Sequence, residues 1–397
     1  MEYVALKDVC KINMGQSPDS SSYNDKKEGI PFYQGNADFG EKHPIPRVWC
    51  NAPTKIAQPK DILMSVRAPI GALNYAQEKC CIGRGLAAIT PDKDKLSLEF
   101  LYWFLRGKNS ELNSKGTGST FKAISKKTLE EIRVPLIDLE KQQKMAQALE
   151  KTYSVIQMRT KQLKELDDLI KARFVEMFGN PLDKSKANMY FVECVEFNPK
   201  KSEVKDLMCE TVSFVPMECV GADGSFKIKE DGLVKDYYKG YTYFKNGDVL
   251  LAKITPCFEN GKVAIAENCT NGIGFGTTEF HVSRPIPGVS NSQWIKYMLK
   301  NEHVHELATI NMTGSAGQKR IQTPFFEKLK VYLPPIELQN QFADFVSQID
   351  KSKLLSGCRF FHSWAPENRD KPKHVGVPRR RTKALRRVRR QHVHLHH

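Results

Sequence analysis

The sequence predicts an α+β fold in which two tandem homologous β-rich domains are each followed by a long helix. Two observations lead to this prediction. An internal repeat relates the second half of the chain to the first, and a long segment with coiled-coil spacing joins the two copies. The length of 397 residues is enough for two or three domains, and a hydrophobic content of 40% is enough for ordinary buried cores.

The repeat is clearest where each β-rich domain passes into its helix. The segment ISKKTLEEIRVPLIDLEKQQKMAQAL (124–149) aligns without a gap with IQTPFFEKLKVYLPPIELQNQFADFV (321–346), which lies 197 residues later. Three upstream pairs support the alignment: KDILMSVRAPIGAL (60–73) with GDVLLAKITPCFENGKVAI (247–265), FLYWFL (100–105) with WIKYML (294–299), and GTGSTFKAIS (116–125) with MTGSAGQKRIQ (312–322). A period this long indicates duplicated domains rather than a solenoid. We therefore expect residues 1–138 and 181–335 to share one architecture.

Each copy has the same predicted order of elements. Short strands come first, separated by turns such as Asn246-Gly247 and Asn260-Gly261. A short apolar helix and a loop rich in Gly, Ser and Thr follow. A β-like Val-Pro-Leu segment then leads into the start of a polar helix.

A helical spacer is predicted over residues 139–180, with the helix itself covering about 139–178. Its apolar residues are spaced alternately by four and three, and Gly179-Asn180-Pro181 is a typical helix end. One narrow apolar stripe on a charged helix favours a partner helix, although packing on its own domain is the alternative. The residues expected to face the partner are Met145, Leu149, Ile156, Leu163, Leu166, Ile170 and Met177.

A second helical spacer is predicted to begin at residues 336–353, but the apolar pattern fails near Leu354. Residues 354–397 contain 12 Lys and Arg against Glu367 and Asp370, a net charge of +10, which leaves +6 of the total +16 for the preceding chain. They also hold six of the ten histidines. An out-of-frame or added tail, a native basic arm for nucleic acid and a metal-binding His cluster remain open interpretations. We expect this non-homologous tail to be disordered.

The combined motifs resemble the specificity subunit of type I restriction–modification enzymes. The resemblance covers residues 1–353 and rests on VPLIDLEKQQKMAQAL, VYLPPIELQNQFADFV, the GSTFKAIS and GSAGQKRIQ loops, and LIKARFVEMFGNP. It implies that each β-rich domain is a target-recognition domain that reads half of a bipartite DNA sequence. It also implies an antiparallel coiled coil between the two helices, with an approximate internal two-fold.

The same resemblance implies the partners. These are double-stranded DNA, methyltransferase subunits and restriction/translocase subunits. The methyl donor and ATP would belong to those subunits, so no cofactor is expected on this chain. The loss of the second helical pattern is the departure from the family, and it bears on assembly.

The chemistry of the side chains indicates which residues could contact DNA. Base edges are read by Arg, Lys, Asn and Gln on loops or strands, and phosphates are bound by small loops with exposed N–H groups and nearby cations. Each candidate also has an ordinary interpretation as a turn residue or an ion-pair partner. The candidates are Gln16, Ser17, Gln34, Asn36, Arg47, Arg67, Arg84, Gly118, Ser119, Lys122, Lys253, Ser315, Lys319 and Arg320. Tyrosines interleave with lysines over residues 235–245, a pattern that favours core packing over base stacking.

Motifs for catalysis are missing from the sequence. Asn180-Pro181 and Asn198-Pro199 lack the Pro-aromatic continuation of an adenine methyltransferase loop, and no GxxxxGK[ST] phosphate loop occurs. Irregularly spaced cysteines without a CxxC pair favour reduced thiols and no metal site. With no signal-peptide or membrane-span pattern, we expect a cytoplasmic, non-catalytic subunit. The recognition part of a single-chain restriction enzyme and a non-DNA scaffold are the alternative functions.

Overall fold

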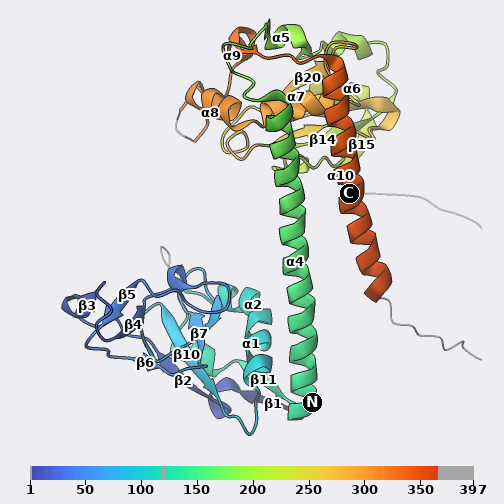
Figure 1. Ribbon diagram of the computed structural model, residues 1–397. Helices are drawn as coiled ribbons and strands as arrows, with labels where there is room; N and C mark the ends of the chain where they lie inside the picture. The colour runs from blue at the N-terminus through green and yellow to red at the C-terminus, as the bar shows by residue number, and fades with distance from the viewer. Residues whose placement is uncertain (1, 118–121, 316, 365–397) are drawn as a thin grey trace, which may run out of the picture. The chain divides into compact units, whose positions relative to one another are not determined.

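The computed structural model describes residues 2–117, 122–315 and 317–364, with side chains described as far as Leu354. The chain divides into two compact units, residues 1–164 and residues 165–397 (Figure 1). Each unit has its own sheets and its own buried core.

The first unit contains three sheets. A two-stranded sheet joins β1 (Glu2–Ala5) to β11 (Arg133–Leu136). A four-stranded antiparallel sheet has the order β2 (Cys10–Met14), β10 (Leu86–Pro91), β7 (Ile62–Ser65) and β8 (Leu73–Tyr75). A five-stranded sheet has the order β3 (Tyr23–Asn24), β5 (Val48–Cys50), β4 (Ile30–Tyr33), β9 (Cys80–Ile82) and β6 (Ile56–Ala57). Within it, β4 and β9 are parallel and the other pairs are antiparallel.

One helix covers the core of the first unit. This helix, α1 (Leu98–Gly107), begins where the Ser97 hydroxyl accepts a hydrogen bond from the Phe100 amide at 3.2 Å, a typical N-cap. Its apolar face is buried in one cluster with Ile62, Met64 and Ile89 of the four-stranded sheet. The shorter helices are α2 (Asn109–Ser114) and α3 (Lys126–Glu130).

The second unit repeats this plan. A two-stranded sheet joins β12 (Met189–Tyr190) to β21 (Lys330–Val331). A four-stranded antiparallel sheet has the order β13 (Val195–Phe197), β20 (Phe280–Pro285), β17 (Val249–Ala252) and β18 (Val263–Ile265). The third sheet has the order β15 (Glu230–Leu233), β14 (Thr211–Val215), β19 (Ile273–Gly276) and β16 (Thr242–Lys245), with β14 and β19 parallel.

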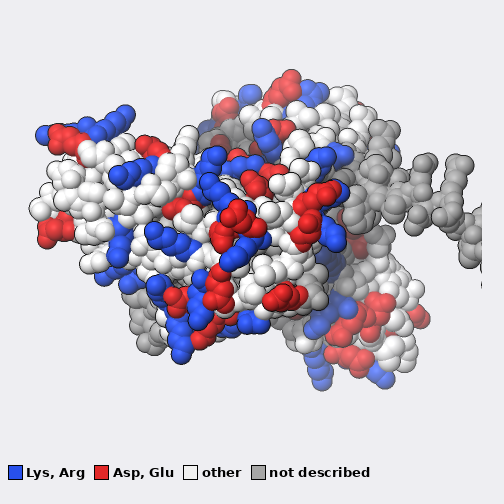
Figure 2. All heavy atoms as spheres, turned by 90° about the horizontal axis from the view of Figure 1, so that it is seen from below, with Lys and Arg blue, Asp and Glu red and all other residues white. Residues whose placement is uncertain are grey.

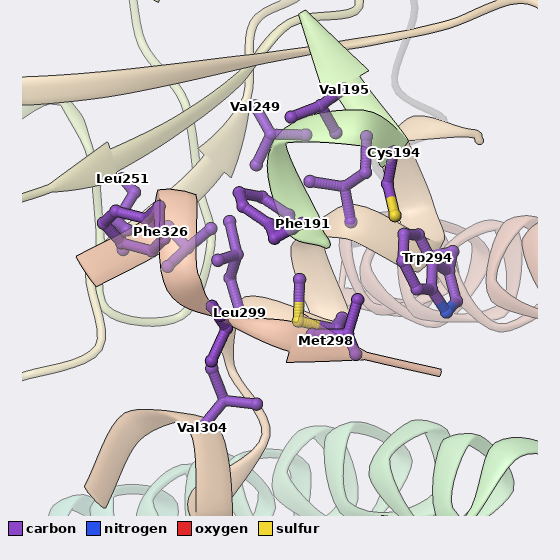
Figure 3. Close-up of a cluster of buried hydrophobic side chains, with 14 of the residues drawn as sticks. Phe191, Cys194, Val195, Val249, Leu251, Trp294, Met298, Leu299, Val304 and Phe326 are labelled. Carbon is purple, nitrogen blue, oxygen red and sulfur yellow. The ribbon is translucent and has the colours of Figure 1, made fainter. Parts of the chain in front are cut away.

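The core of the second unit lies between its helices and the sheet β13-β20-β17-β18. Trp294 and Met298 on α7 (Ser292–Leu299) gather with Phe191 and Phe326 around buried aliphatic side chains (Figure 3). Such large, fully buried aromatic side chains dominate core energetics. The remaining short helices are α5 (Phe191–Cys194), α6 (Val234–Tyr237), α8 (Glu302–Ile310) and α9 (Thr323–Lys328).

The two units have the same topology. The order β2-β10-β7-β8 corresponds strand for strand to β13-β20-β17-β18, and the parallel pair β4/β9 corresponds to β14/β19. The first unit differs by one additional short edge strand, β3. The predicted α+β fold with two tandem homologous β-rich domains is therefore confirmed.

The long helix α4 runs over Leu139–Phe178, the range expected from the sequence. It begins where the Asp138 carboxylate accepts hydrogen bonds from the amides of Glu140 at 3.0 Å and Lys141 at 3.2 Å. It ends before Gly179, whose φ of 70° is the left-handed conformation common just after a helix. Both ends are therefore specified locally.

The second long helix, α10 (Ile336–Trp364), packs antiparallel against the part of α4 that lies in the second unit (Figure 1). Phe342 contacts Phe178, with ring centroids 5.6 Å apart, and the Lys353 ammonium lies 2.7 Å from Asp167. Residues 354–364, part of the tail expected to be disordered, instead continue this helix to Trp364. The apolar spacing that favours packing stops near Leu354, but nothing there breaks a helical backbone. The first proline after Leu354, a residue that breaks helices, is Pro366.

Candidate nucleic-acid interface

Four candidate residues of the first unit meet on neighbouring loops. Gln16 and Ser17 follow β2, Gln34 follows β4, and Arg84 lies between β9 and β10. The Gln16 amide donates to the Ile82 carbonyl at 3.0 Å, and the Arg84 amide donates to the Ser17 hydroxyl at 3.4 Å. The side chains of Gln16, Gln34 and Arg84 are exposed. Polar groups far apart in sequence therefore form one small surface.

Two glycines allow these loops to lie this close together. A Cβ atom on Gly85 would be 2.4 Å from the Gln34 carbonyl oxygen, and one on Gly83 would be 3.0 Å from the Gln34 Cα. The Gly85 amide donates to that same carbonyl at 3.1 Å. Any larger residue at position 85 would push the backbones apart. The close approach leaves Arg84 at the tip of its loop with its side chain in solvent.

Arg67 and Lys122 extend this surface. Val66, which precedes Arg67, donates its amide to the Gly85 carbonyl at 2.9 Å, and the Ala68 amide donates to the Lys122 carbonyl at 3.0 Å. Arg67 and Lys122 are exposed. Among the residues that the structure describes, Arg67, Arg84 and Lys122 have no carboxylate partner within ion-pair distance. The candidates Gly118 and Ser119, in the same loop as Lys122, lie outside the described residues.

Arg47 and Asn36 lie beside this surface but Arg47 is already paired. Its guanidinium lies 2.7 Å from the Asp38 carboxylate and also donates to the Ala37 carbonyl. Asp38 in turn accepts a hydrogen bond from the Gln34 amide at 2.7 Å. Asn36 is half-buried in the same turn. The Arg47 side chain is therefore committed to shaping the loop that carries Gln34.

The candidates of the second unit gather in the corresponding place. Lys253 follows β17 and accepts, through its carbonyl, a hydrogen bond from the Ile321 amide at 2.9 Å. Lys319 donates its amide to the Thr255 hydroxyl at 3.1 Å, and Ser315 is exposed in the same loop. Arg320 forms a two-point ion pair with Glu279, with both closest N–O distances at 3.0 Å. The cation of Arg320 is thus already neutralised.

The repeat also identifies a position that the sequence reasoning missed. In the second unit, the loop between β19 and β20 holds Thr277, Thr278 and Glu279 where the first unit has Arg84 between β9 and β10. Thr278 is exposed. The segments differ in sequence, and only the matched strand order shows that they correspond. The two units therefore present different chemistry at one shared position.

The tyrosine-rich segment is partly buried in the second unit. Tyr243 is 2% exposed and its hydroxyl donates to Glu203 at 3.0 Å. Tyr237 stacks on Phe214 with ring centroids 4.8 Å apart, and Tyr241 meets Phe214 edge-on. Tyr243 therefore agrees with the predicted core packing, whereas Tyr241 is 37% exposed.

The stripe predicted on α4 divides into a buried and an exposed part. Ile170 is fully buried and Met177 partly buried in the core of the second unit, and Leu166 is half-buried. Phe174 and Phe178, which the sequence reasoning did not single out, are buried beside them. Phe174 follows Ile170 by four residues and Phe178 follows Phe174 by four, which was the available signal. Exposed fractions are large for Met145 (49%), Leu149 (44%), Ile156 (50%) and Leu163 (43%).

Charges of both signs mix on the face in Figure 2, and several cysteines are buried. On the face seen in Figure 2, Lys and Arg are interspersed with Asp and Glu rather than gathered into a patch of one sign. Burial raises the pKa of the Cys10, Cys80, Cys194 and Cys269 thiols to about 12, which keeps them protonated and unreactive. The described residues include no cluster of His, Cys, Asp or Glu able to hold a metal ion. Nor does any described helix have the length and apolar character of a membrane span.

Comparison with known proteins defines the class. The family model described as the type I restriction modification DNA specificity domain matches residues 1–168 and 210–357. These two matched segments make up most of the chain and fall one on each half of the repeat. The chain belongs to this family.

Individual relatives are similar over part of their length. The chain is 45% identical over 157 residues to a putative type I restriction enzyme MjaX specificity subunit from Methanocaldococcus jannaschii, covering 40% of this chain and 37% of the relative. It is 46% identical over 147 residues to the EcoEI specificity subunit from Escherichia coli, covering 36% and 24%. The chain thus spans less than half the length of these curated relatives.

A solved structure shares the fold over nearly the whole chain. It is the S subunit of a type I restriction-modification system from M. genitalium, with a TM-score of 0.51. The alignment covers 91% of this chain and 92% of that one, at 15% sequence identity. At this identity the likeness supports the fold.

Proposed function

We propose that this chain is the sequence-specific DNA-binding subunit of a type I restriction–modification complex and reads a bipartite target. The observation that carries the proposal is the duplicated topology, which places polar, cation-bearing loops at the same strand ends in both units. A split recognition sequence needs two recognition domains, and the repeat provides two domains of one topology. Membership of the specificity-domain family supports the same role.

The first unit is proposed to read its half-site through Gln16, Gln34 and Arg84. Gln matches adenine, and Arg matches the two acceptors of guanine in the major groove. Arg67 and Lys122 are exposed and unpaired in the described chain, which suits phosphate contact. Because Arg47 is bound to Asp38, we assign it to loop shape rather than to direct readout.

The second unit is proposed to read a different half-site. Thr278 stands in place of Arg84, and Arg320 is paired with Glu279. Lys253, Ser315 and Lys319 remain available in that loop cluster for phosphate or base contact. Different side chains at corresponding positions are what a non-palindromic bipartite target requires.

We propose that α4 sets the spacer between the two half-sites. A continuous helix of 40 residues is about 60 Å long, whereas a flexible linker would leave the spacer undefined. The exposed Met145, Leu149, Ile156 and Leu163 are proposed to contact helices of methyltransferase subunits. Exposed apolar residues that recur along a charged helix mark a protein interface.

We also propose that the chain is non-catalytic and acts in the cytoplasm. Methylation and cleavage would be carried out by the methyltransferase and restriction/translocase subunits, which hold the methyl donor and ATP.

The test is to co-express the chain with its methyltransferase and map methylated bases by sequencing. We expect methylation confined to one motif made of two short words separated by a fixed number of unread bases. Methylation at a continuous motif, or none that depends on this chain, would contradict the proposal. The motif found in this way supplies the DNA for the experiments below.

A further inference from the structure

A fully buried glutamine lies in the first turn of α4. Gln142 is 0% exposed, and its Oε1 accepts a hydrogen bond from the Ser97 amide at 2.8 Å. Its Nε2 donates to the carbonyls of Lys95 at 2.9 Å and Ile137 at 2.8 Å. Ser97 is the residue that caps α1. One side chain therefore joins the start of the long helix, the strand-to-helix connection and the start of the core helix.

The second unit contains the same arrangement. Gln339, in the first turn of α10, is also 0% exposed, and its Oε1 accepts from the Asn291 amide at 3.0 Å. Its Nε2 donates to the carbonyls of Val289 and Pro334, both at 2.9 Å. Asn291 caps α7, the counterpart of α1.

The correspondence holds atom by atom. Gln339 follows Gln142 by 197 residues, and Pro334 follows Ile137 by the same number. In both units the acceptor oxygen meets the amide of the capping residue, and one donor hydrogen meets the carbonyl two residues before it. Two units whose recognition loops differ have thus kept one buried amide with the same three bonds.

These bonds fix direction in a way that apolar packing does not. Ala146 on α4, and Phe342 and Val346 on α10, hold their helices against the domain cores, but such contacts are non-directional. A planar amide with its acceptor and both donors engaged allows one orientation, and removing Gln142 leaves three part-buried backbone groups without this partner. Each glutamine therefore acts as a joint between a domain and its helix.

We propose that Gln142 and Gln339 are positioning residues that fix the direction in which each long helix leaves its domain. This inference rests on the function proposed above. A fixed helix direction makes the complex bind only targets with one number of base pairs between the half-sites. A loosened joint would let a reading domain swing relative to its helix and accept a target one base pair longer or shorter. The glutamines touch no DNA themselves, because they are buried.

The DNA test compares Gln142→Met with two controls. Methionine keeps the volume of the side chain and removes all three hydrogen bonds. Gln143→Met changes the exposed neighbour, and Leu129→Ala destabilises the same core away from the joint. Binding is measured on duplexes whose spacer is the native length, one base pair shorter or one longer. We expect Gln142→Met to lose about tenfold in discrimination between spacers, while both controls keep it.

A second measurement does not depend on DNA. Spin labels introduced as unnatural amino acids at the exposed positions Lys79 and Gln157, both in the first unit, report the distance between domain and helix. We expect a broader distance distribution in Gln142→Met than in Gln143→Met. Hydrogen exchange at the Ser97 amide should rise in the same variant, because its acceptor is gone.

The outcomes separate the two proposals. An unchanged distance distribution together with unchanged spacer discrimination in folded Gln142→Met would overturn the role of the joint. A wild-type complex without any bipartite target would instead contradict the proposed function, and the distance measurement would still decide the joint. If Gln142→Met does not fold, Gln142→Glu, which keeps only the acceptor, is measured in the same way. Gln339→Met is then measured on the same set of spacer duplexes.

Discussion

Replacing Arg84 by alanine tests how the first unit reads DNA. The Arg84 side chain is exposed at the tip of a loop between Gly83 and Gly85, and within the described chain no carboxylate competes for it. A two-point contact between Arg and guanine contributes about 1–3 kcal/mol of discrimination, equal to about 5- to 150-fold in affinity. We expect Arg84→Ala to lose affinity for the native target by that factor.

The assay distinguishes base readout from phosphate contact. Fluorescence anisotropy is measured with the native duplex and with duplexes altered at each guanine of the first half-site, at several salt concentrations. Base readout predicts that Arg84→Ala binds the native and one altered duplex equally, whereas a phosphate contact predicts uniform weakening and a salt slope reduced by about 1.

Arg47→Ala is the matched control for this experiment. Its guanidinium is already held by Asp38, so its loss should weaken binding less and leave the guanine preference assigned to Arg84 unchanged. If Arg84→Ala changed neither affinity nor salt dependence, the assignment of the Gln16, Gln34 and Arg84 surface to DNA would be wrong.

Three further predictions concern assembly and stability. Leu163→Asp places a charge on the exposed stripe of α4 and should prevent co-purification with the methyltransferase while leaving unspecific DNA binding intact; retained co-purification would count against the stripe as an interface. Phe342→Ala should cost about 3–5 kcal/mol in the free energy of urea unfolding, because the ring is fully buried against Phe174 and Phe178, and half-buried Phe345→Ala should cost less. Burial lowers the pKa of His281 to about 4 from 6.5, so its neutral ring contributes stability that is complete above pH 6.5 and is lost as the pH falls toward 4. Unfolding at pH 5 should therefore show a loss of about 2 kcal/mol relative to pH 7.5, which His281→Gln should remove; an equal loss in that variant would assign the effect to other groups.

The His281 prediction rests on a specific tautomer. Its Nε2 lies 2.9 Å from the Ile321 carbonyl, which can only accept, so Nε2 carries the hydrogen. Its Nδ1 then accepts from the Asn198 Nδ2 at 3.3 Å. Protonating Nδ1 would place two donors face to face inside a buried site, in addition to the cost of burying the charge.

Elements whose ends are set by residues next to them in the sequence could be predicted from the sequence. Asp138 and Gly179 mark the two ends of α4 because a helix end is completed by hydrogen bonds and backbone angles of adjacent residues. The repeat required only a comparison of the chain with itself. Disorder from residue 354 was wrong for residues 354–364, because an apolar pattern and a helical backbone are separate properties.

The candidate DNA surface could be predicted only in part. Side-chain chemistry indicates Gln16, Gln34 and Arg84 one at a time, and nothing local in the sequence indicates that they lie together. The same chemistry indicates Arg47 and Arg320, yet Arg47 is paired with Asp38 in the preceding loop and Arg320 with Glu279, 41 residues away. Whether a cation is available for a ligand depends on neighbours that a single sequence does not specify.

The sequence by itself determined that the protein is a duplication, where its long helix begins and ends, and which residue types its loops carry. These properties follow from local sequence patterns or from comparing one half of the chain with the other. Tertiary structure alone decided which loops meet, which cations remain free, and that Gln142 and Gln339 are buried with every polar atom bonded. The physical reason is that such hydrogen bonds join segments tens of residues apart, and their partners are fixed only when the sheets and helices have packed.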